Sequence, residues 1–397
     1  MKADERADRE RAFPLGAAVT LEALDRDPHP LLARLREREP VSWIPALGGW
    51  LITRYDDALD VMRDARHFTV DDPRFSTAQV LGPSMLSLDG PEHRRHRSPF
   101  APPFRPRDVQ REFAQDTATE AARLVDELEP SGAGELRRGF AGPLAAAIVA
   151  RALGLGPREA PAVLRWYDAI VAAVTAITAG QPVPSSGRRA FAQLRARLLA
   201  AIERGRAGSL LGAVAAHDQL SREELVSNAG VLLFGGVETT EGMIANALVH
   251  VLERPEVLHR VRSDEELLDQ AIEESLRLEP AAAVVDRYTT AVVSLRGATI
   301  ASGELVRVSI AGANRDPAVF DEPDRFDLER ANARRHFAFA HGPHTCLGLH
   351  LARLEARTAL AHVLDRLPRL RLDQARRAPV TGIVFRKPAA LHAVWGP

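Results

Sequence analysis

The chain has 397 residues, more than the roughly 250–300 that usually share one hydrophobic core, so we expect two domains or one large composite fold. A formal net charge of −1 gives no electrostatic reason to expect a nucleic acid or a membrane surface as a partner. One cysteine, a charged N-terminus and no run of 18 apolar residues predict a protein of a reducing compartment without signal peptide or membrane span.

The first part of the chain mixes short helical and strand patterns. Residues 31–38 have a helical pattern, and 41–44 with 50–53 predict a hairpin around two glycines. Helix returns at 56–65. Residues 68–90 show no clear period, and a loop of that length in a compact domain is generally functional or mobile.

A short basic helix follows Asp89. It places His93 and Arg97 at i and i+4 on one face, an arrangement that suits a bound dianion. The alternative is an ordinary solvated basic face.

Amphipathic helices are predicted at 109–128, 136–153, 160–178 and 188–204. Prolines and glycines interrupt the pattern at 180–187, and two helices joined by such a tip can open and close over a buried site.

The longest predicted helix begins at a Ser221–Glu224 capping box and runs to Glu253, which at ~1.5 Å per residue makes it nearly 50 Å long. Its middle contains Gly235 and Gly236, each costing roughly 1 kcal/mol relative to alanine. Close approach of a flat ligand or a helix–helix crossing would explain them. Glu238 and Thr239 are polar residues among apolar neighbours, although a helical threonine can simply bond the carbonyl at i−4.

A second capping box is predicted at Ser263 and Glu266, opening a helix that ends at Pro280. Glu274 and Arg277 form an i, i+3 ion pair there, and most such pairs lie on the surface. Strand-like alternation then runs to Ile310.

The only cysteine, Cys346, lies between a loop rich in glycine and proline and a predicted helix at 347–366. A helix N-terminus lowers a thiol pKa, so Cys346 can be a thiolate and a metal ligand. Zinc fits poorly because it needs about four clustered ligands, whereas haem iron needs one axial thiolate. Taken alone, a single cysteine is more often a small buried hydrophobic residue.

The pattern Phe-x-x-Gly-x-His-x-Cys-x-Gly at 339–348 resembles the cysteine-ligand loop of the cytochrome P450 family of haem-thiolate monooxygenases. Gly-Gly-x-Glu-Thr-Thr at 235–240 and Glu-x-x-Arg at 274–277 match two further motifs of that family. The resemblance implies a mainly α fold with small β-sheets (α+β), in which the long helix crosses over the haem. It implies one domain over 1–397, β-rich near 41–55, 284–310 and 380–395, and a lid built on the helices around 180–187.

The resemblance also implies roles for individual residues. Cys346 binds the iron of haem b, Thr239 and Glu238 support oxygen activation and proton relay, and Gly235 and Gly236 make room for dioxygen. The remaining haem contacts are His93, Arg97, Arg287, Phe339, His344 and Gly348. Glu274 and Arg277, completed by Arg325, form a buried structural group. Ala340 departs from the family pattern, which commonly has glycine there, and its methyl group is expected to tighten the loop.

The expected activity is insertion of one oxygen atom from O2 into a small, largely hydrophobic substrate, with electrons from a ferredoxin and its reductase docking near Arg353 or Arg357. The alternatives are a haem-thiolate enzyme that does not use O2, such as an isomerase, dehydratase or peroxygenase, and a haem sensor. We expect a cytoplasmic monomer without nucleic-acid or membrane partners, acting on a secondary-metabolite intermediate. The predicted pocket walls are Val80, Leu81, Met85, Leu86, Val231, Val237, Ala282, Val284, Val285 and Ile383.

Overall fold

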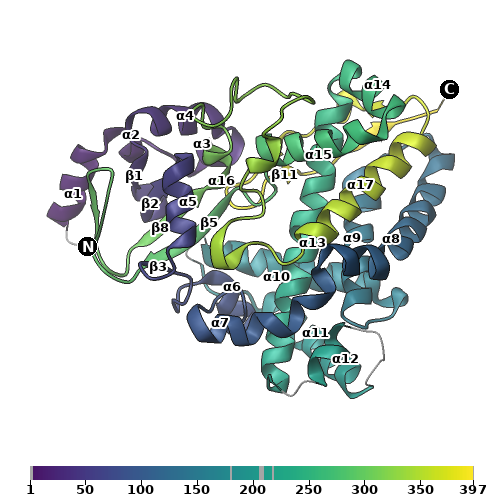
Figure 1. The fold of residues 1–397 in the computed structure, drawn as a ribbon, viewed down its shortest axis with the longest axis horizontal. Coiled ribbons are helices and arrows are strands. Elements are labelled where there is room, and N and C mark those ends of the chain that lie inside the picture. The colour runs from purple at the N-terminus through teal and green to yellow at the C-terminus, as the bar shows by residue number, and fades with distance from the viewer. Residues whose placement is uncertain (1–2, 179–180, 205–209, 217–218, 397) are drawn as a thin grey trace. The chain divides into compact units, whose positions relative to one another are not determined.

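The computed structural model describes residues 3–178, 181–204, 210–216 and 219–396. The chain divides into two compact units. Figure 1 labels the helices and strands. Unit 1 comprises Met1–Val70, Asp269–Cys346 and Ala378–Ala389, and unit 2 comprises Asp71–Leu268, Leu347–Arg377 and Ala390–Pro397. Long helices dominate the described residues and the sheets are small, so the predicted fold class is confirmed.

Unit 1 contains the larger sheet. Its helices are α1 (Ala3–Ala12), α2 (Pro14–Ala17), α3 (Leu21–Arg26), α4 (His29–Arg38), α5 (Tyr55–Arg63) and α16 (Ile310–Ala313). Its strands are β1 (Val41–Ile44), β2 (Gly49–Ile52), β3 (Phe68–Thr69), β5 (Val284–Thr289), β6 (Val293–Leu295), β7 (Ala298–Ile300), β8 (Leu305–Ser309), β10 (Val380–Thr381) and β11 (Lys387–Pro388).

The five-stranded sheet of unit 1 has the order β1-β2-β8-β5-β3, with β2 and β8 parallel and the other pairs antiparallel. Successive residues of a strand point to opposite faces. Trp43 and Trp50 accordingly pack in one core cluster, while Ile44 and Leu51 pack in another. Both faces are therefore buried, and the predicted hairpin at 41–53 is confirmed.

Unit 2 is mainly helical. Its helices are α6 (Ser76–Leu81), α7 (Gly90–Arg97), α8 (Pro106–Leu128), α9 (Gly142–Ala152), α10 (Ala160–Thr178), α11 (Ser185–Glu203), α12 (Leu210–Ala215), α13 (Arg222–Leu252), α14 (Pro255–Ser263) and α17 (Leu349–Arg366). A sheet of β4 (Ala133–Glu135), β12 (His392–Val394) and β9 (Arg371–Leu372) completes it. The boundary between the units falls within α15 (Glu265–Leu278).

Helix α13 is the long helix that the sequence predicts. The Ser221 hydroxyl accepts from the backbone of Glu224, and the Glu224 carboxylate accepts from the backbone of Ser221, so the capping box is confirmed. The second predicted box is wrong. The Ser263 hydroxyl bonds back into α14, and the Asp264 carboxylate accepts from the Glu266 amide in its place. The predicted tip at 180–187 includes Gly180, which lies outside the described residues.

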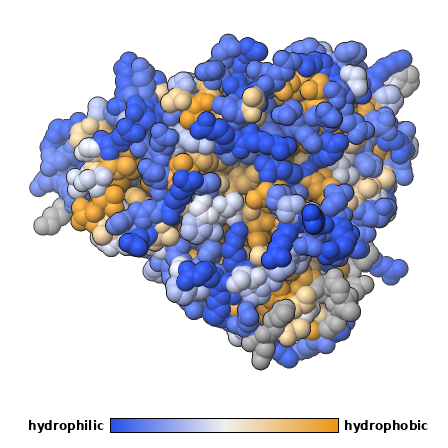
Figure 2. Space-filling model, in the orientation of Figure 1, coloured by the Kyte–Doolittle hydropathy of each residue, from blue (hydrophilic) through white to orange (hydrophobic). Residues whose placement is uncertain are grey.

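By length and composition alone, one described helix could cross a membrane: the window Ala160–Ile177 of α10, of which 39% is buried. This is weak evidence, because core helices of water-soluble proteins pass the same test. Helix α10 packs against α9, α11 and α13 of its own unit. Figure 2 shows that hydrophilic residues cover most of the visible face.

Candidate functional site

Cys346 closes a tight loop at the end of the second segment of unit 1. Its backbone N–H donates to the carbonyl of Phe339 at 2.8 Å, and the Thr345 hydroxyl donates to the carbonyl of Gly342 at 2.8 Å. A 3₁₀ turn at Gly342–His344 lies between these contacts. The loop thus holds a half-buried thiol three residues before α17 begins at Leu349.

Two residues with a left-handed backbone conformation shape this loop. Gly342 has φ +75°, and a β-carbon there would lie 2.4 Å from the carbonyl oxygen of Met62, so glycine is required. Ala340 has φ +54°, a conformation that costs an L-residue roughly 1–2 kcal/mol. The methyl group that the sequence analysis expected to tighten the loop therefore strains its backbone. Burial, together with the charge of Arg63 at 2.8 Å, lowers the pKa of the His341 imidazole.

Basic side chains occur in both units. Arg287 on β5 is buried and donates to the carbonyl of Asp286 at 2.8 Å, and His344 lies in the turn before Cys346. On α7, His93 is buried and Arg97 is half-buried, one helical turn apart. Their joint role as anion contacts stays a prediction.

The two glycines of α13 serve different purposes. A β-carbon on Gly236 would lie 2.5 Å from Cγ2 of Val149 on α9, so this glycine permits close helix packing. A β-carbon on Gly235 would meet no described heavy atom within 4 Å, apart from its two chain neighbours and the nearby backbone of α13 itself. Of the two glycines, Gly235 is therefore the one that borders open space, and their role in making room for dioxygen stays a prediction.

Thr239 lies one turn after Gly235 on a partly exposed stripe of an otherwise buried helix. Its hydroxyl donates to the carbonyl of Gly235 at 2.6 Å, which is the i−4 bond that the sequence left open as an alternative. Thr239 therefore adjoins the open space at Gly235 while its proton is engaged within the helix.

Glu238 points away from that stripe into a buried cluster. The Tyr167 hydroxyl on α10 donates to the Glu238 carboxylate, and it lies 3.5 Å from the carboxylate of Glu241. Arg137 and Arg138 each approach Glu241 at 3.3 Å. Glu238 and Tyr167 are 2% and 1% exposed, so bulk water is excluded from their bond.

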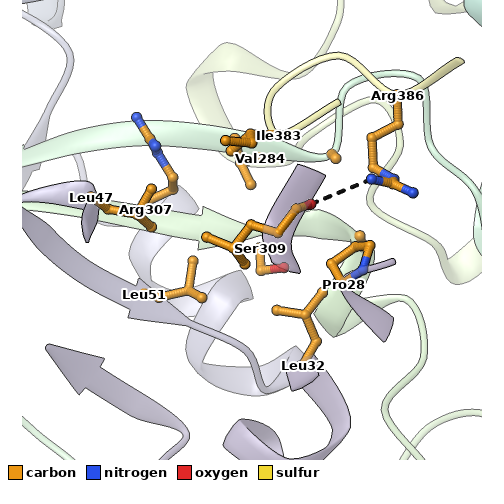
Figure 3. A pocket seen from close by; sticks show the side chains of 12 residues that line it. Pro28, Leu32, Leu47, Leu51, Val284, Arg307, Ser309, Ile383 and Arg386 are labelled. Atoms are coloured by element: carbon orange, nitrogen blue, oxygen red, sulfur yellow. Dashed lines mark hydrogen bonds between the residues drawn. The ribbon is translucent and has the colours of Figure 1, made fainter. Parts of the chain in front are cut away.

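Part of the predicted pocket wall lies in one small apolar pocket of unit 1, with a volume of about 20 Å³ (Figure 3). Val284 and Ile383 line it, with Leu32 and Leu51 from α4 and β2 (Figure 3). Arg307 and Arg386 at its edge are engaged by Asp286 and Glu279. This pocket therefore offers mainly apolar contacts.

Other predicted wall residues are core residues. Strand alternation sends Val285 to the face opposite Val284, where it packs against the sheet core. Leu81 and Val237 are fully buried at 0% exposure. The structure contradicts a wall role for Leu81 and Val237, whereas Val285 is only partly buried and its role stays a prediction. Periodicity in sequence does not reveal which neighbouring element covers a side chain.

The remaining wall residues keep their status as predictions. Met85 donates its backbone N–H to Oδ1 of Asn228 on α13 at 2.8 Å, so the segment that carries Met85 and Leu86 is attached to α13. Val80 and Val231 are buried in unit 2, and Ala282 forms a β-bridge with Phe385 in unit 1.

Comparisons with known proteins agree with this arrangement. The family model for cytochrome P450 matches residues 203–380. The chain is 35% identical to nocardicin C N-oxygenase of Nocardia uniformis subsp. tsuyamanensis, covering 97% of this chain and 98% of that protein. It is 34% identical to mycinamicin IV hydroxylase/epoxidase of Micromonospora griseorubida, covering 97% and 98%. The chain belongs to the cytochrome P450 family.

Solved structures agree with this assignment. The crystal structure of CalO2 matches this P450 with a TM-score of 0.86 and 31% identity, covering 95% of this chain and 98% of that one. The protein is therefore a P450 monooxygenase with a haem-thiolate iron cofactor, which acts on a small molecule with O2.

The residues of this P450 fit that cofactor. Among the described residues no group of three or more His, Cys, Asp or Glu could hold a metal ion, so a site built from protein ligands alone is absent there. A haem needs only one protein thiolate, because the porphyrin supplies the other ligands. Cys346, the single cysteine of the chain, sits in a loop that can supply it.

The buried ion pair of this P450 differs from the prediction in one member. Glu274 and Arg277 are fully buried and 2.8 Å apart, but Arg330 completes the group by donating to Glu274 at 2.9 Å. The Arg325 side chain is exposed and pairs with Glu322, so the prediction is wrong for this residue. Only the carbonyl of Arg325 takes part, accepting from Arg277 at 3.1 Å.

This ion group fixes the irregular segment before the cysteine loop of the P450 by hydrogen bonds to its backbone. Arg277 donates to the carbonyls of Asn314 and Pro323, and Arg330 donates to that of Asp321. Two charged side chains thus satisfy backbone carbonyls that no regular element would pair.

Sequence reasoning missed Tyr167, Glu241 and Asn228. Glu241 follows Glu238 by three residues, which places both carboxylates on one face of α13. Tyr167 is the only tyrosine in its apolar helix. Both signals were present in the sequence, but neither shows that α10 packs against α13.

Proposed function

We propose that this P450 binds haem b through Cys346 and inserts one oxygen atom from O2 into a largely hydrophobic secondary-metabolite intermediate. The observation that carries the proposal is the stripe on α13. Gly235 borders open space, Thr239 places a hydroxyl one turn further along, and Glu238, the residue before Thr239, points from the stripe into the buried cluster. An enzyme that does not activate oxygen has no need of this arrangement.

When bound, the haem supplies a thiolate-ligated iron at which O2 is reduced. The chain supplies protons and keeps water away. Threonine in a helix has two accessible χ1 rotamers, so Thr239 can exchange its bond to Gly235 for one directed at the open space. The buried carboxyl of Glu238 is the neighbouring group that can hold and return a proton. We assign haem propionate contacts to His93, Arg97, Arg287 and His344, and packing of the cysteine loop to Phe339 and Gly348.

The substrate proposal rests on the chemistry of the proposed wall residues and on the relatives. The proposed wall residues are apolar, which favours a substrate with a hydrophobic part. The two relatives named above carry the names of natural products, nocardicin C and mycinamicin IV, and one is an N-oxygenase while the other is a hydroxylase/epoxidase. We therefore propose a natural-product intermediate as substrate and leave the type of oxygenation to the product analysis below.

We further propose that residues 1–397 form one catalytic domain, a cytoplasmic monomer that receives electrons from a ferredoxin and its reductase. Arg353 and Arg357 on α17 are the proposed docking charges, and Arg357 also pairs with Glu265 at 3.3 Å. Charge-driven docking predicts that reduction slows steeply as salt rises above about 0.1 M. Reduction that is insensitive to salt would contradict an electrostatic docking site.

The test is a panel of hydrophobic compounds scored by the spin-state change of the ferric protein. The best binder is then turned over with NAD(P)H, ferredoxin and reductase while O2 uptake and product are measured. We expect one oxygen atom from O2 in the product and a loss of product of about 10²-fold in Thr239→Val, which keeps the shape and removes the hydroxyl. Product without O2 uptake would indicate an isomerase or dehydratase, and product with peroxide alone a peroxygenase. A haem spectrum with binding but no product would favour a sensor.

A further inference from the structure

The buried cluster around Tyr167 joins three elements of unit 2. Tyr167 comes from α10, Glu238 and Glu241 from α13, and Arg137 and Arg138 from the turn that precedes α9. The guanidinium of Arg138 lies 5.6 Å from the centre of the Tyr167 ring and also pairs with Asp168 at 2.6 Å. The phenol is thus fixed from several sides.

The protonation state of Tyr167 follows from this setting. Burial, with the charges of Glu238 and Glu241, raises the pKa of Tyr167 well above its ordinary value. Tyr167 therefore remains a neutral phenol at any pH the enzyme meets. A neutral phenol beside a carboxylate donates its O–H, so the direction of the bond to Glu238 is settled.

The two carboxylates of α13 are held differently. Glu241 has two arginines at 3.3 Å, which balance its charge in a site that is 0% exposed. Glu238 receives a hydrogen bond from a neutral donor, which can be exchanged at much lower cost than a buried charge pair. Glu241 is therefore a fixed structural charge, whereas Glu238 is oriented but can still move.

We propose that Tyr167 is a positioning residue that holds the Glu238 carboxyl in the buried cluster, turned away from Thr239, and so sets the position from which the carboxyl turns to deliver protons. The proposal rests on the role given to Glu238 under the proposed function. Because the donor belongs to α10 and the acceptor to α13, the bond exists only while these helices are packed together. Proton delivery is thereby tied to the packed position of α10.

The test compares Tyr167→Phe with Tyr55→Phe. Both substitutions remove one hydroxyl from a buried tyrosine, but the Tyr55 hydroxyl donates to the backbone carbonyl of Arg335 at 2.8 Å. In turnover of the best-binding compound, Tyr167→Phe should lower the product formed per O2 consumed by about fivefold, the factor that corresponds to one net hydrogen bond. Peroxide release and the solvent isotope effect on kcat should rise, KM should stay unchanged, and Tyr55→Phe should behave like wild type.

A second readout needs no turnover. The infrared carboxylate band of Glu238, identified by its loss in Glu238→Gln, should shift in Tyr167→Phe and stay in place in Tyr55→Phe. The double variant Tyr167→Phe/Glu238→Gln should form as much product per O2 consumed as Glu238→Gln alone, because the Tyr167 hydroxyl acts through Glu238.

An infrared band that does not shift in Tyr167→Phe would overturn the proposal. So would a loss of product per O2 in the double variant that equals the product of the losses in the two single variants. A wild-type protein that forms no oxygenated product contradicts the proposed function instead. That outcome is distinguishable, because the infrared shift in Tyr167→Phe would then still be seen.

Discussion

Gly236 on α13 and Val149 on α9 approach so closely that a β-carbon on the glycine would lie 2.5 Å from Cγ2 of the valine. Contacts under 3.0 Å cannot be accommodated without movement, so the two helices could not keep this separation with any other residue at 236. Gly235 is under no such restriction.

These neighbouring glycines should respond oppositely to alanine. Gly236→Ala should lower the free energy of unfolding by about 1–3 kcal/mol through overpacking, despite the better helix propensity of alanine. Gly235→Ala should leave stability unchanged or raise it by up to about 1 kcal/mol. Urea unfolding of the ferric protein measures both, and Gly236→Ala/Val149→Ala should recover part of the loss. Equal destabilisation by the two single substitutions would contradict the assignment.

The loss of stability on replacing each arginine by alanine should identify the one that completes the buried ion group. Arg330→Ala should lower the free energy of unfolding by about 3–5 kcal/mol, because Glu274 would keep a buried charge without its second partner. Arg325→Ala is the matched control and should change stability by less than about 0.5 kcal/mol, since its side chain is exposed. A larger loss for Arg325→Ala than for Arg330→Ala would restore the original prediction.

Glu355 on α17 should make stability depend on pH. Its side chain is buried, and desolvation raises the pKa of its carboxyl well above the ordinary value. The unfolded chain releases this proton near pH 4.3, so above about that pH the folded state binds more protons and stability falls as pH rises. Glu355→Gln should abolish this decline. The free energy of unfolding of the variant, relative to that of wild type, should therefore rise between pH 5 and the pKa of the folded carboxyl.

The control for Glu355 is Glu256→Gln on α14, an exposed glutamate whose variant should follow the wild-type pH curve. Denaturant midpoints measured across the pH range give the comparison. A Glu355→Gln curve parallel to wild type would show that the buried carboxyl is compensated in the folded state.

Asn228 should link α13 to the proposed substrate wall. Asn228→Ala leaves the buried N–H of Met85 without its acceptor and should cost about 1–3 kcal/mol of stability. Because Met85 and Leu86 are proposed wall residues, the spin-state titration should also show weaker substrate binding. Asn228→Asp keeps an oxygen for Met85 and should bind substrate better than the alanine variant. Unchanged substrate affinity in both variants would remove Met85 and Leu86 from the wall.

The sequence predicted those elements whose signals are local. The capping box at Ser221, the hairpin at 41–53 and the length of α13 depend on neighbouring residues, and all are confirmed. Short elements such as α6 within 76–81 were missed, because six residues carry too little periodicity to stand out in an irregular stretch.

The errors have one physical origin, which is that tertiary packing decides which side chains meet. Arg325 and Arg330 lie five residues apart in an irregular segment, and only the path of the backbone brings the second one to Glu274. Adjacent Gly235 and Gly236 look alike in sequence, but α9 covers one of them. The cysteine loop was predictable because its glycines, histidine and cysteine form one contiguous pattern.

The most direct test of the central claim is the carbon monoxide difference spectrum of the reduced protein, wild type against Cys346→Ser. We expect the absorbance of a thiolate-ligated haem in wild type and its complete loss in Cys346→Ser. Arg325→Ala, which lies outside the loop, should keep the wild-type spectrum. A Cys346→Ser protein that retains the thiolate-type spectrum would contradict the assignment of Cys346 as the haem ligand.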